Sequence, residues 1–63
     1  MNRLKEFRFN KSVTQYQLAL LAQVQQSRIS LIENGLIEGR EDERQRIAKA
    51  LSVCPEEIFP EGK

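Results

Sequence analysis

The sequence predicts an all-α domain made of five short helices, and three observations support this prediction. Apolar residues recur at helical spacing, and no stretch alternates apolar and polar residues as a half-buried strand would. Capping residues, glycines and prolines divide the chain at short intervals. A chain of 63 residues is at most one domain, and it buries roughly 60% of its unfolded surface. We therefore expect residues 1–63 to fold as one unit.

The first helix is expected near residues 3–10, with Asn2 as its cap. Leu4, Phe7 and Arg8 share one face of this helix, because they are spaced i, i+3 and i+4. An arginine on an apolar stripe is unusual, because burying an unpaired charge is costly.

The second helix is expected to begin at Gln15. Thr14 is followed three residues later by Gln17, and this spacing forms a capping box. The inward stripe of this helix is expected to contain Leu18, Leu21 and Ala22.

The third helix is expected at residues 26–33, with Gln25 as an imperfect cap and Gly35 just beyond its end. Ile29 and Ile32 point inwards. The residues on the opposite side are small or uncharged, and they are Ser27, Ser30, Leu31 and Asn34.

A loop at residues 36–39 precedes a fourth helix, expected at residues 40–51. Pro55 suits the first position of a short fifth helix, with Cys54 as a poor cap and Pro60 beyond its end. The expected core consists of Leu18, Leu21, Val24, Ile29, Ile32, Ile47, Leu51, Val53 and Ile58. Three apolar residues fall off the inward stripes and are either simply exposed or part of a partner surface: Phe9, Tyr16 and Leu20.

The residue inventory argues against an enzyme. The chain has no histidine, so neither a Ser-His nor a Cys-His arrangement is available. Cys54 is the only cysteine, which makes a poor metal site and fits a reducing cytoplasm. The three glycines form no phosphate loop, and the carboxylates at residues 41–43 suit the start of a helix. We expect no catalytic residue, metal or small-molecule cofactor.

The composition also bears on location and partners. No run of about 18 apolar residues is present, so no membrane span is expected, and the basic start leads into no signal peptide.

Residues 1–32 hold five basic residues against one acidic residue, a net charge of +4. Residues 33–63 hold five basic against eight acidic residues, a net charge of −3. This asymmetry favours one anion-facing side.

Residues 14–35 carry the main functional signal. A helix, a short turn and a second helix form the unit that places one helix across a DNA backbone and the next in the major groove. Gln and Asn side chains can bond adenine there, and Arg can bond guanine. The candidate DNA-binding residues in this unit are Gln15, Gln25, Gln26, Ser27, Arg28, Ser30, Leu31 and Asn34.

The stretch TQYQLALLAQVQQSRISLIENG resembles the helix-turn-helix of lambda-repressor/Cro-type (XRE-type) transcriptional regulators of bacteria and phages. LKEFR is similar to the first helix of that family, and IAKALSV and PEEIF are similar to its last two helices. The resemblance covers nearly the whole chain. It implies a compact five-helix, lambda-repressor-like DNA-binding domain in a bacterial cytoplasm, associated with the nucleoid.

The resemblance also implies roles for individual residues. Gln15 and Asn34 would face phosphates at helix ends, and Arg28 and Ser30 would reach bases or backbone. The residues placed over bases would be Gln26, Ser27 and Leu31. An ion pair between Arg8 and Glu33 would lock the first helix onto the third, which would explain the arginine on the apolar stripe.

The chain departs from the family pattern in three places. Gln23 replaces the glycine of the turn, and Leu31 occupies a position that is often polar or basic. Polar residues stand where the fourth helix often has apolar or small ones. That helix is therefore expected either to start late or to leave part of the core to Leu36 and Ile37.

We expect a small transcriptional regulator, most simply a repressor, that binds a palindromic double-stranded DNA operator as a homodimer. The dimer surface is expected around the last two helices and Phe59, far from the basic half. Two alternatives remain open. One is an antitoxin-like or anti-repressor module in which the third helix faces protein. The other is the DNA-reading part of a longer regulator, although the Met1 start and the short tail at residues 61–63 favour a complete chain.

Overall fold

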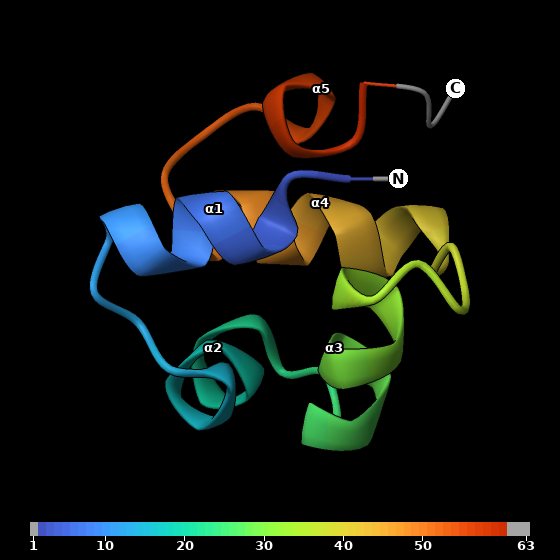
Figure 1. The fold of residues 1–63 in the computed structure, drawn as a ribbon, viewed down its shortest axis with the longest axis horizontal. Coiled ribbons are helices and arrows are strands. Elements are labelled where there is room, and N and C mark those ends of the chain that lie inside the picture. Colours follow the sequence, from blue (N-terminus) through green and yellow to red (C-terminus); the bar gives the residue numbers. More distant parts are fainter. Residues whose placement is uncertain (1, 61–63) are drawn as a thin grey trace.

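The computed structural model describes residues 2–60, and within them the chain forms five α-helices and no strand (Figure 1). The helices are α1 (Leu4–Asn10), α2 (Gln15–Ala22), α3 (Gln26–Glu33), α4 (Glu41–Ala50) and α5 (Pro55–Ile58). This architecture confirms the all-α fold class. The expectations about Met1 and residues 61–63 lie outside the described residues.

In Figure 1, α2 and α3 lie on one side of α1 and α4, and α5 lies on the opposite side. Helix α2 packs against both α3 and α4, and α4 packs against α5. The backbone N–H of Arg3 donates to the carbonyl of Ile58 over 2.9 Å, which ties the start of the chain to α5. The two halves of the sequence therefore enclose one core.

The core holds most of the apolar residues expected there. The buried apolar side chains are Leu4, Leu18, Ala19, Ala22, Val24, Ile29, Ile32, Ile47, Ala48, Leu51, Ile58 and Phe59. Val53 is only half-buried and packs at the edge of this cluster.

Leu21 was expected in the core, and that prediction is wrong because the residue is 62% exposed. The buried face of α2 is made instead by Leu18, Ala19 and Ala22. At about 100° per residue, Ala19 and Leu21 diverge from Leu18 in opposite directions around the helix. Once the helix buries its alanine side, Leu21 points to solvent.

The first helix begins at Leu4, one residue later than predicted, so Arg3 and not Asn2 is its N-cap residue. The Asn2 side chain still bonds the first amide of the helix. Asn2 Oδ1 accepts from the N–H of Leu4 over 3.0 Å, and Asn2 Nδ2 donates to the carbonyl of Ile32 over 2.7 Å. One asparagine therefore starts α1 and joins it to the last turn of α3.

The predicted capping box starts α2 at Gln15. The backbone N–H of Gln17 donates to Thr14 Oγ1, and the N–H of Thr14 donates to Gln17 Oε1, both over 3.0 Å. Two amides that the helix itself cannot satisfy are bonded in this way.

The bounds of α3 match the prediction, and Gly35 follows the helix with a left-handed φ of 76°. Gln25 is the N-cap residue, but its side chain makes no capping hydrogen bond. Helix α4 is one residue shorter at each end than predicted. It does not start late, and Ile37 packs against the core while Leu36 is 70% exposed.

The short α5 begins with Pro55, as predicted. Phe59 follows it and is buried in the core. The ring therefore packs inside the domain and is not available to the expected dimer surface, whereas the rest of that surface, around α4 and α5, stays a prediction. No helix within residues 2–60 has the length and apolar character needed to cross a membrane.

Candidate nucleic-acid interface

Helices α2 and α3 pack together as a helix-turn-helix, joined by residues 23–25. Gln23 takes a left-handed conformation, with φ 58° and ψ 44°, at the position where the family pattern has glycine. The N–H of Val24 then donates to the carbonyl of Ala19 over 3.1 Å, and the Val24 side chain enters the core. The buried side chain of Val24 therefore anchors the turn to the core.

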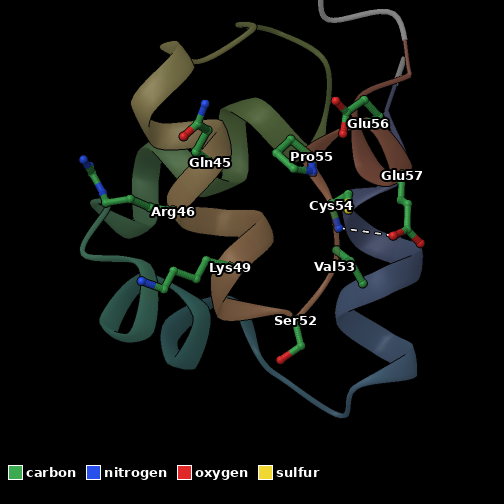
Figure 2. Close-up of a pocket in the computed structure, with 9 residues that line it drawn as sticks. All are labelled: Gln45, Arg46, Lys49, Ser52, Val53, Cys54, Pro55, Glu56 and Glu57. Carbon is green, nitrogen blue, oxygen red and sulfur yellow. Dashed lines mark hydrogen bonds between the residues drawn. The ribbon is translucent and has the colours of Figure 1, made fainter.

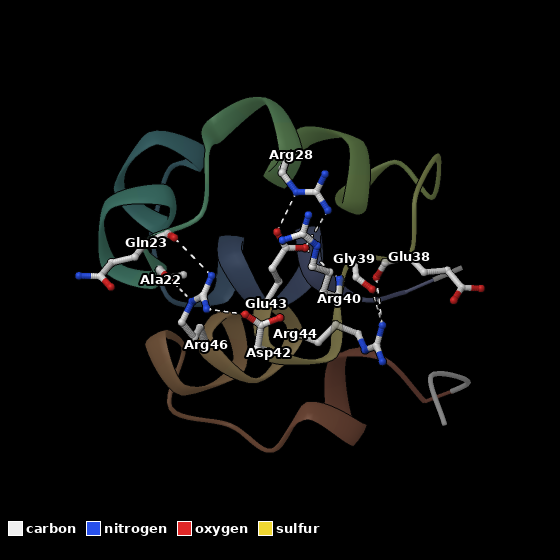
Figure 3. Close-up of polar contacts among 10 residues, drawn as sticks. All are labelled: Ala22, Gln23, Arg28, Glu38, Gly39, Arg40, Asp42, Glu43, Arg44 and Arg46. Atoms are coloured by element: carbon white, nitrogen blue, oxygen red, sulfur yellow. Dashed lines mark hydrogen bonds and ion pairs between the residues drawn. The ribbon is translucent and has the colours of Figure 1, made fainter.

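Arg46 of α4 binds backbone carbonyls of the same turn, and sequence reasoning did not identify this role. Its Nε donates to the carbonyl of Ala22 over 2.9 Å, and its Nη2 reaches the carbonyl of Gln23 over 3.4 Å (Figure 3). Its Nη1 lies 2.8 Å from Asp42 Oδ2. A cation at the carbonyl end of α2 also complements the helix dipole.

The outer face of α3 carries short or uncharged side chains. Gln26, Ser27, Leu31 and Asn34 are exposed, and Ser30 is half-buried. Gln25, just before the helix, is also exposed. Asn34 Nδ2 donates to the carbonyl of Ser30 over 2.9 Å, so this amide partly satisfies the end of its own helix. The remaining side chains form a neutral surface that can donate and accept hydrogen bonds.

Arg28 does not belong to this outer face in the structure. Its Nε donates to Glu43 Oε2 over 2.8 Å, and its Nη2 donates to Glu43 Oε1 over 2.9 Å (Figure 3). The expectation placed Arg28 beside the base-reading residues, whereas the fold pairs it with α4. Nothing in the local sequence indicated this pair, because the rest of α3 and the loop before α4 separate the two residues.

Glu43 is the second residue that sequence reasoning missed. Its side chain is 6% exposed, and its Oε1 also accepts the N–H of Arg40 over 2.9 Å. The hydrogen bonds from Arg28 outweigh the opposing effect of burial and lower the pKa of Glu43 to about 2. The carboxylate is therefore ionised throughout the neutral range.

On the other side of α3, Glu33 pairs with Arg8 of α1. Arg8 Nη2 lies 2.8 Å from Glu33 Oε2, and the side chains are 9% and 2% exposed. Gln15 Nε2 donates to Glu33 Oε1 over 3.0 Å. Burial alone raises the pKa of Glu33, but the hydrogen bonds from Arg8 and Gln15 outweigh it and the net shift is downward.

Gln15 is half-buried, and its amide nitrogen is bonded to Glu33. Its expected phosphate contact stays a prediction. Among the basic residues of α1 and its flanks, Arg3 pairs with Glu6 over 3.0 Å. Lys5 and Lys11 are exposed and take part in none of the ion pairs among residues 2–60. The positive charge near α1 is therefore carried mainly by these two lysines.

A shallow groove lies between α4 and α5 (Figure 2). Arg46, Lys49, Cys54, Glu56 and Glu57 contribute to its lining. Glu57 Oε2 accepts the backbone N–H of Cys54 over 3.1 Å, so one carboxylate caps α5. Within residues 2–60, no group of three histidine, cysteine or acidic side chains is placed to hold a metal ion. The α3 face remains the better candidate site.

Comparison with known proteins gives one informative similarity. The chain is 58% identical over 33 residues to a protein of Mycobacterium tuberculosis (strain ATCC 25618 / H37Rv) named "Putative antitoxin HigA2". The match covers 52% of this chain and 33% of that protein. The chain thus spans about one third of the length of this relative. No protein-family model matches the chain.

Proposed function

We propose that the protein is a small transcriptional regulator, acting as a repressor, that binds double-stranded DNA with α3 in the major groove. The observation that carries this proposal is the neutral outer face of α3 and its C-cap, formed by Gln26, Ser27, Ser30, Leu31 and Asn34, all of which except Leu31 can form hydrogen bonds. Major-groove edges present donors, acceptors and thymine methyl groups that such side chains can contact. The similarity to a protein named an antitoxin fits a regulator of this kind.

The contacts divide by type. Gln26 lies in the first turn of α3 and is the best candidate for bidentate bonding to adenine. Ser27 and Ser30 are short enough to let the helix approach the bases, and Leu31 offers apolar contact. Lys5 and Lys11 supply charge for phosphate contacts, which add affinity without sequence information.

A single copy offers few cationic side chains to DNA, so we propose a homodimer on a palindromic operator. Two recognition helices of such a dimer must lie about 34–36 Å apart to enter successive major grooves. The longest dimension of the domain is 26 Å, so two copies side by side can meet that spacing. The expected complex holds two chains per operator.

Selection from a randomised duplex pool, followed by fluorescence anisotropy, tests this function. We expect a palindromic sequence to be enriched. Gln26→Ala should alter the preferred base at one position of each half-site, at a cost of roughly 1–3 kcal/mol. Gln45→Ala is the matched control, because Gln45 is an exposed glutamine on α4 that lines the groove next to α5. Absence of any enriched sequence at low salt would overturn the proposal.

A protein-binding module is the second candidate function. The similarity to a protein named an antitoxin favours it, as do the exposed apolar residues Phe9, Tyr16, Leu20 and Leu21. In that case DNA affinity would not depend on sequence. Gln26→Ala would then leave DNA binding unchanged, whereas Leu20→Lys would weaken capture of the protein partner.

A further inference from the structure

Helix α3 is anchored on both flanks by ion pairs to different helices. Glu33 pairs with Arg8 of α1, and Arg28 pairs with Glu43 of α4. At about 100° per residue, positions 28 and 33 are roughly 140° apart around the helix axis. The two pairs therefore lie on either edge of the buried side of α3, and the neutral outer face on the opposite side of the helix stays free.

The Arg28–Glu43 pair is a bidentate fork. Both carboxylate oxygens are engaged, at 2.8 Å and 2.9 Å, by Nε and Nη2 of the guanidinium. The Arg28 side chain is 34% exposed, whereas that of Glu43 is 6% exposed. One partner is thus near solvent and the other is fixed in the interior (Figure 3).

The burial of Glu43 makes this pair costly to open. If Arg28 swings away, a buried carboxylate keeps only the N–H of Arg40 as a partner. A buried charge that loses its partner is strongly destabilising, and charge-assisted forks are stronger than neutral hydrogen bonds. An exposed arginine without such a partner would be free to follow any nearby phosphate.

We propose that Glu43 restrains Arg28 and withholds its positive charge from DNA phosphates, so that Glu43 sets how tightly the protein binds DNA of any sequence. This inference rests on the proposed DNA-binding function. Glu43 acts here as a positioning residue, because it works through Arg28 and does not itself touch DNA. The consequence is that the neutral face of α3, and not a mobile arginine on its flank, makes the contacts.

A restrained Arg28 affects binding to DNA of any sequence because phosphate contacts add to affinity one by one. Each phosphate that a cation neutralises releases counterions and adds affinity that does not depend on base sequence. It also steepens the slope of log affinity against log salt concentration by about 0.9 per phosphate. A released Arg28 would therefore leave a measurable signature on random-sequence DNA.

The test compares four proteins on a random-sequence duplex by fluorescence anisotropy across a salt titration. They are the wild type, Glu43→Gln, the double variant Glu43→Gln with Arg28→Gln, and Glu41→Gln. The amide of Glu43→Gln offers one acceptor where the carboxylate offers two, so it cannot hold the guanidinium by its fork. Glu41→Gln changes the net charge equally in the same helical turn, but Glu41 is exposed and has no part in the fork.

We expect Glu43→Gln to bind the random duplex roughly three- to tenfold more tightly at 0.1 M salt, with a slope steeper by about 0.9. The double variant should return to the affinity and slope of the wild type, and Glu41→Gln should stay within about twofold of it. Far-ultraviolet circular dichroism establishes that each variant is folded.

Two results would overturn the proposal. One is a folded Glu43→Gln variant whose affinity and salt slope on random DNA equal those of the wild type or fall below them. The other is a double variant that binds random DNA three- to tenfold more weakly than the wild type, because Arg28 would then already contact phosphate. This second comparison still decides the matter if Glu43→Gln alone does not fold, since the double variant retains no buried unpaired charge.

Failure of the proposed function is a separate result. If selection with the wild type enriches no sequence, the regulator function fails, and the restraint is still judged by the salt slopes on random DNA. If selection succeeds and the slopes of all four proteins coincide, the restraint fails and the regulator function stands.

Discussion

Arg8 of α1 and Glu33 at the end of α3 form a buried ion pair that joins two helices remote in sequence. Arg8 Nη2 lies 2.8 Å from Glu33 Oε2, and Arg8 Nη1 donates to the carbonyl of Val13 over 3.0 Å. Gln15 donates to the same carboxylate over 3.0 Å. A single arginine thus binds the end of α3 and the turn before α2, which fixes α3 relative to both helices.

Arg8→Met should be among the most destabilising single changes. It leaves the carboxylate of Glu33 buried with only Gln15 as a side-chain partner, and breaking a buried pair in this way costs roughly 3–5 kcal/mol. That is comparable with the whole stability of a domain of this size. Urea unfolding followed by circular dichroism measures the loss.

The double variant Arg8→Met with Glu33→Met removes both charges and is the matched control. Replacing a buried pair by apolar side chains is often close to neutral, so it should lose less than half of the free energy that Arg8→Met loses. A cost below about 1 kcal/mol for Arg8→Met would show that the pair does not hold α1 on α3.

Gln23→Gly should stabilise the domain by about 0.5–1 kcal/mol. Gln23 has φ 58°, and the left-handed region costs a residue with a Cβ roughly 1–2 kcal/mol. Part of that gain is offset because glycine loses more backbone freedom on folding. Thermal unfolding measures the change. Gln23→Ala keeps the Cβ and should leave the melting temperature nearly unchanged, so an equal gain in both variants would contradict this explanation.

Leu18 and Leu21 provide a matched pair for testing which side of α2 faces the core. Leu18 is fully buried and Leu21 is 62% exposed. Leu18→Ala should lower the free energy of unfolding by roughly 2–5 kcal/mol. Leu21→Ala should change it by no more than about 0.5 kcal/mol. Equal losses in urea unfolding would show that α2 is rotated about its axis from the described position.

Acid should remove the contribution of Glu43 to stability. Its pKa is lowered to about 2 in the folded state, from about 4.3 in an unfolded chain. Between these two pKa values the unfolded state therefore binds more protons than the folded state. The contribution of Glu43 to the free energy of unfolding is thus complete above about pH 5 and is lost as the pH falls towards 2. Glu33, whose pKa is also lowered, adds to the same trend.

The measurement is the free energy of unfolding of the wild type and of Glu43→Gln between pH 7 and pH 2. At pH 7 the wild type should be more stable by about 1–3 kcal/mol, the range for a hydrogen bond to a charged group. The difference should shrink below pH 5 and approach zero near pH 2. A difference that stays constant with pH would contradict the assignment of the shift to Glu43.

Local signals in the sequence predicted most of the helix bounds. The Thr14–Gln17 capping box, Gly35 after α3 and Pro55 at the start of α5 each act through backbone groups within a few residues. Such signals can be recognised without knowledge of the fold. The direction in which α2 turns its apolar side was not one of them, because Leu21 and Ala19 lie on opposite sides of Leu18, about 60° and 100° away, and both are apolar.

The sequence by itself determined the number and type of the helices, the helix-turn-helix unit and the chemistry available on α3. Only the tertiary structure decided which of the candidate side chains are already paired or buried within the domain. In the folded domain Arg28 pairs with Glu43, Gln15 bonds to Glu33, and Phe59 is buried. The reason is that a helix start or a periodic face depends on neighbours in the chain, whereas an ion pair between residues 15 apart depends on how α3 and α4 pack. Burial of Glu43 then makes such a pair costly to open.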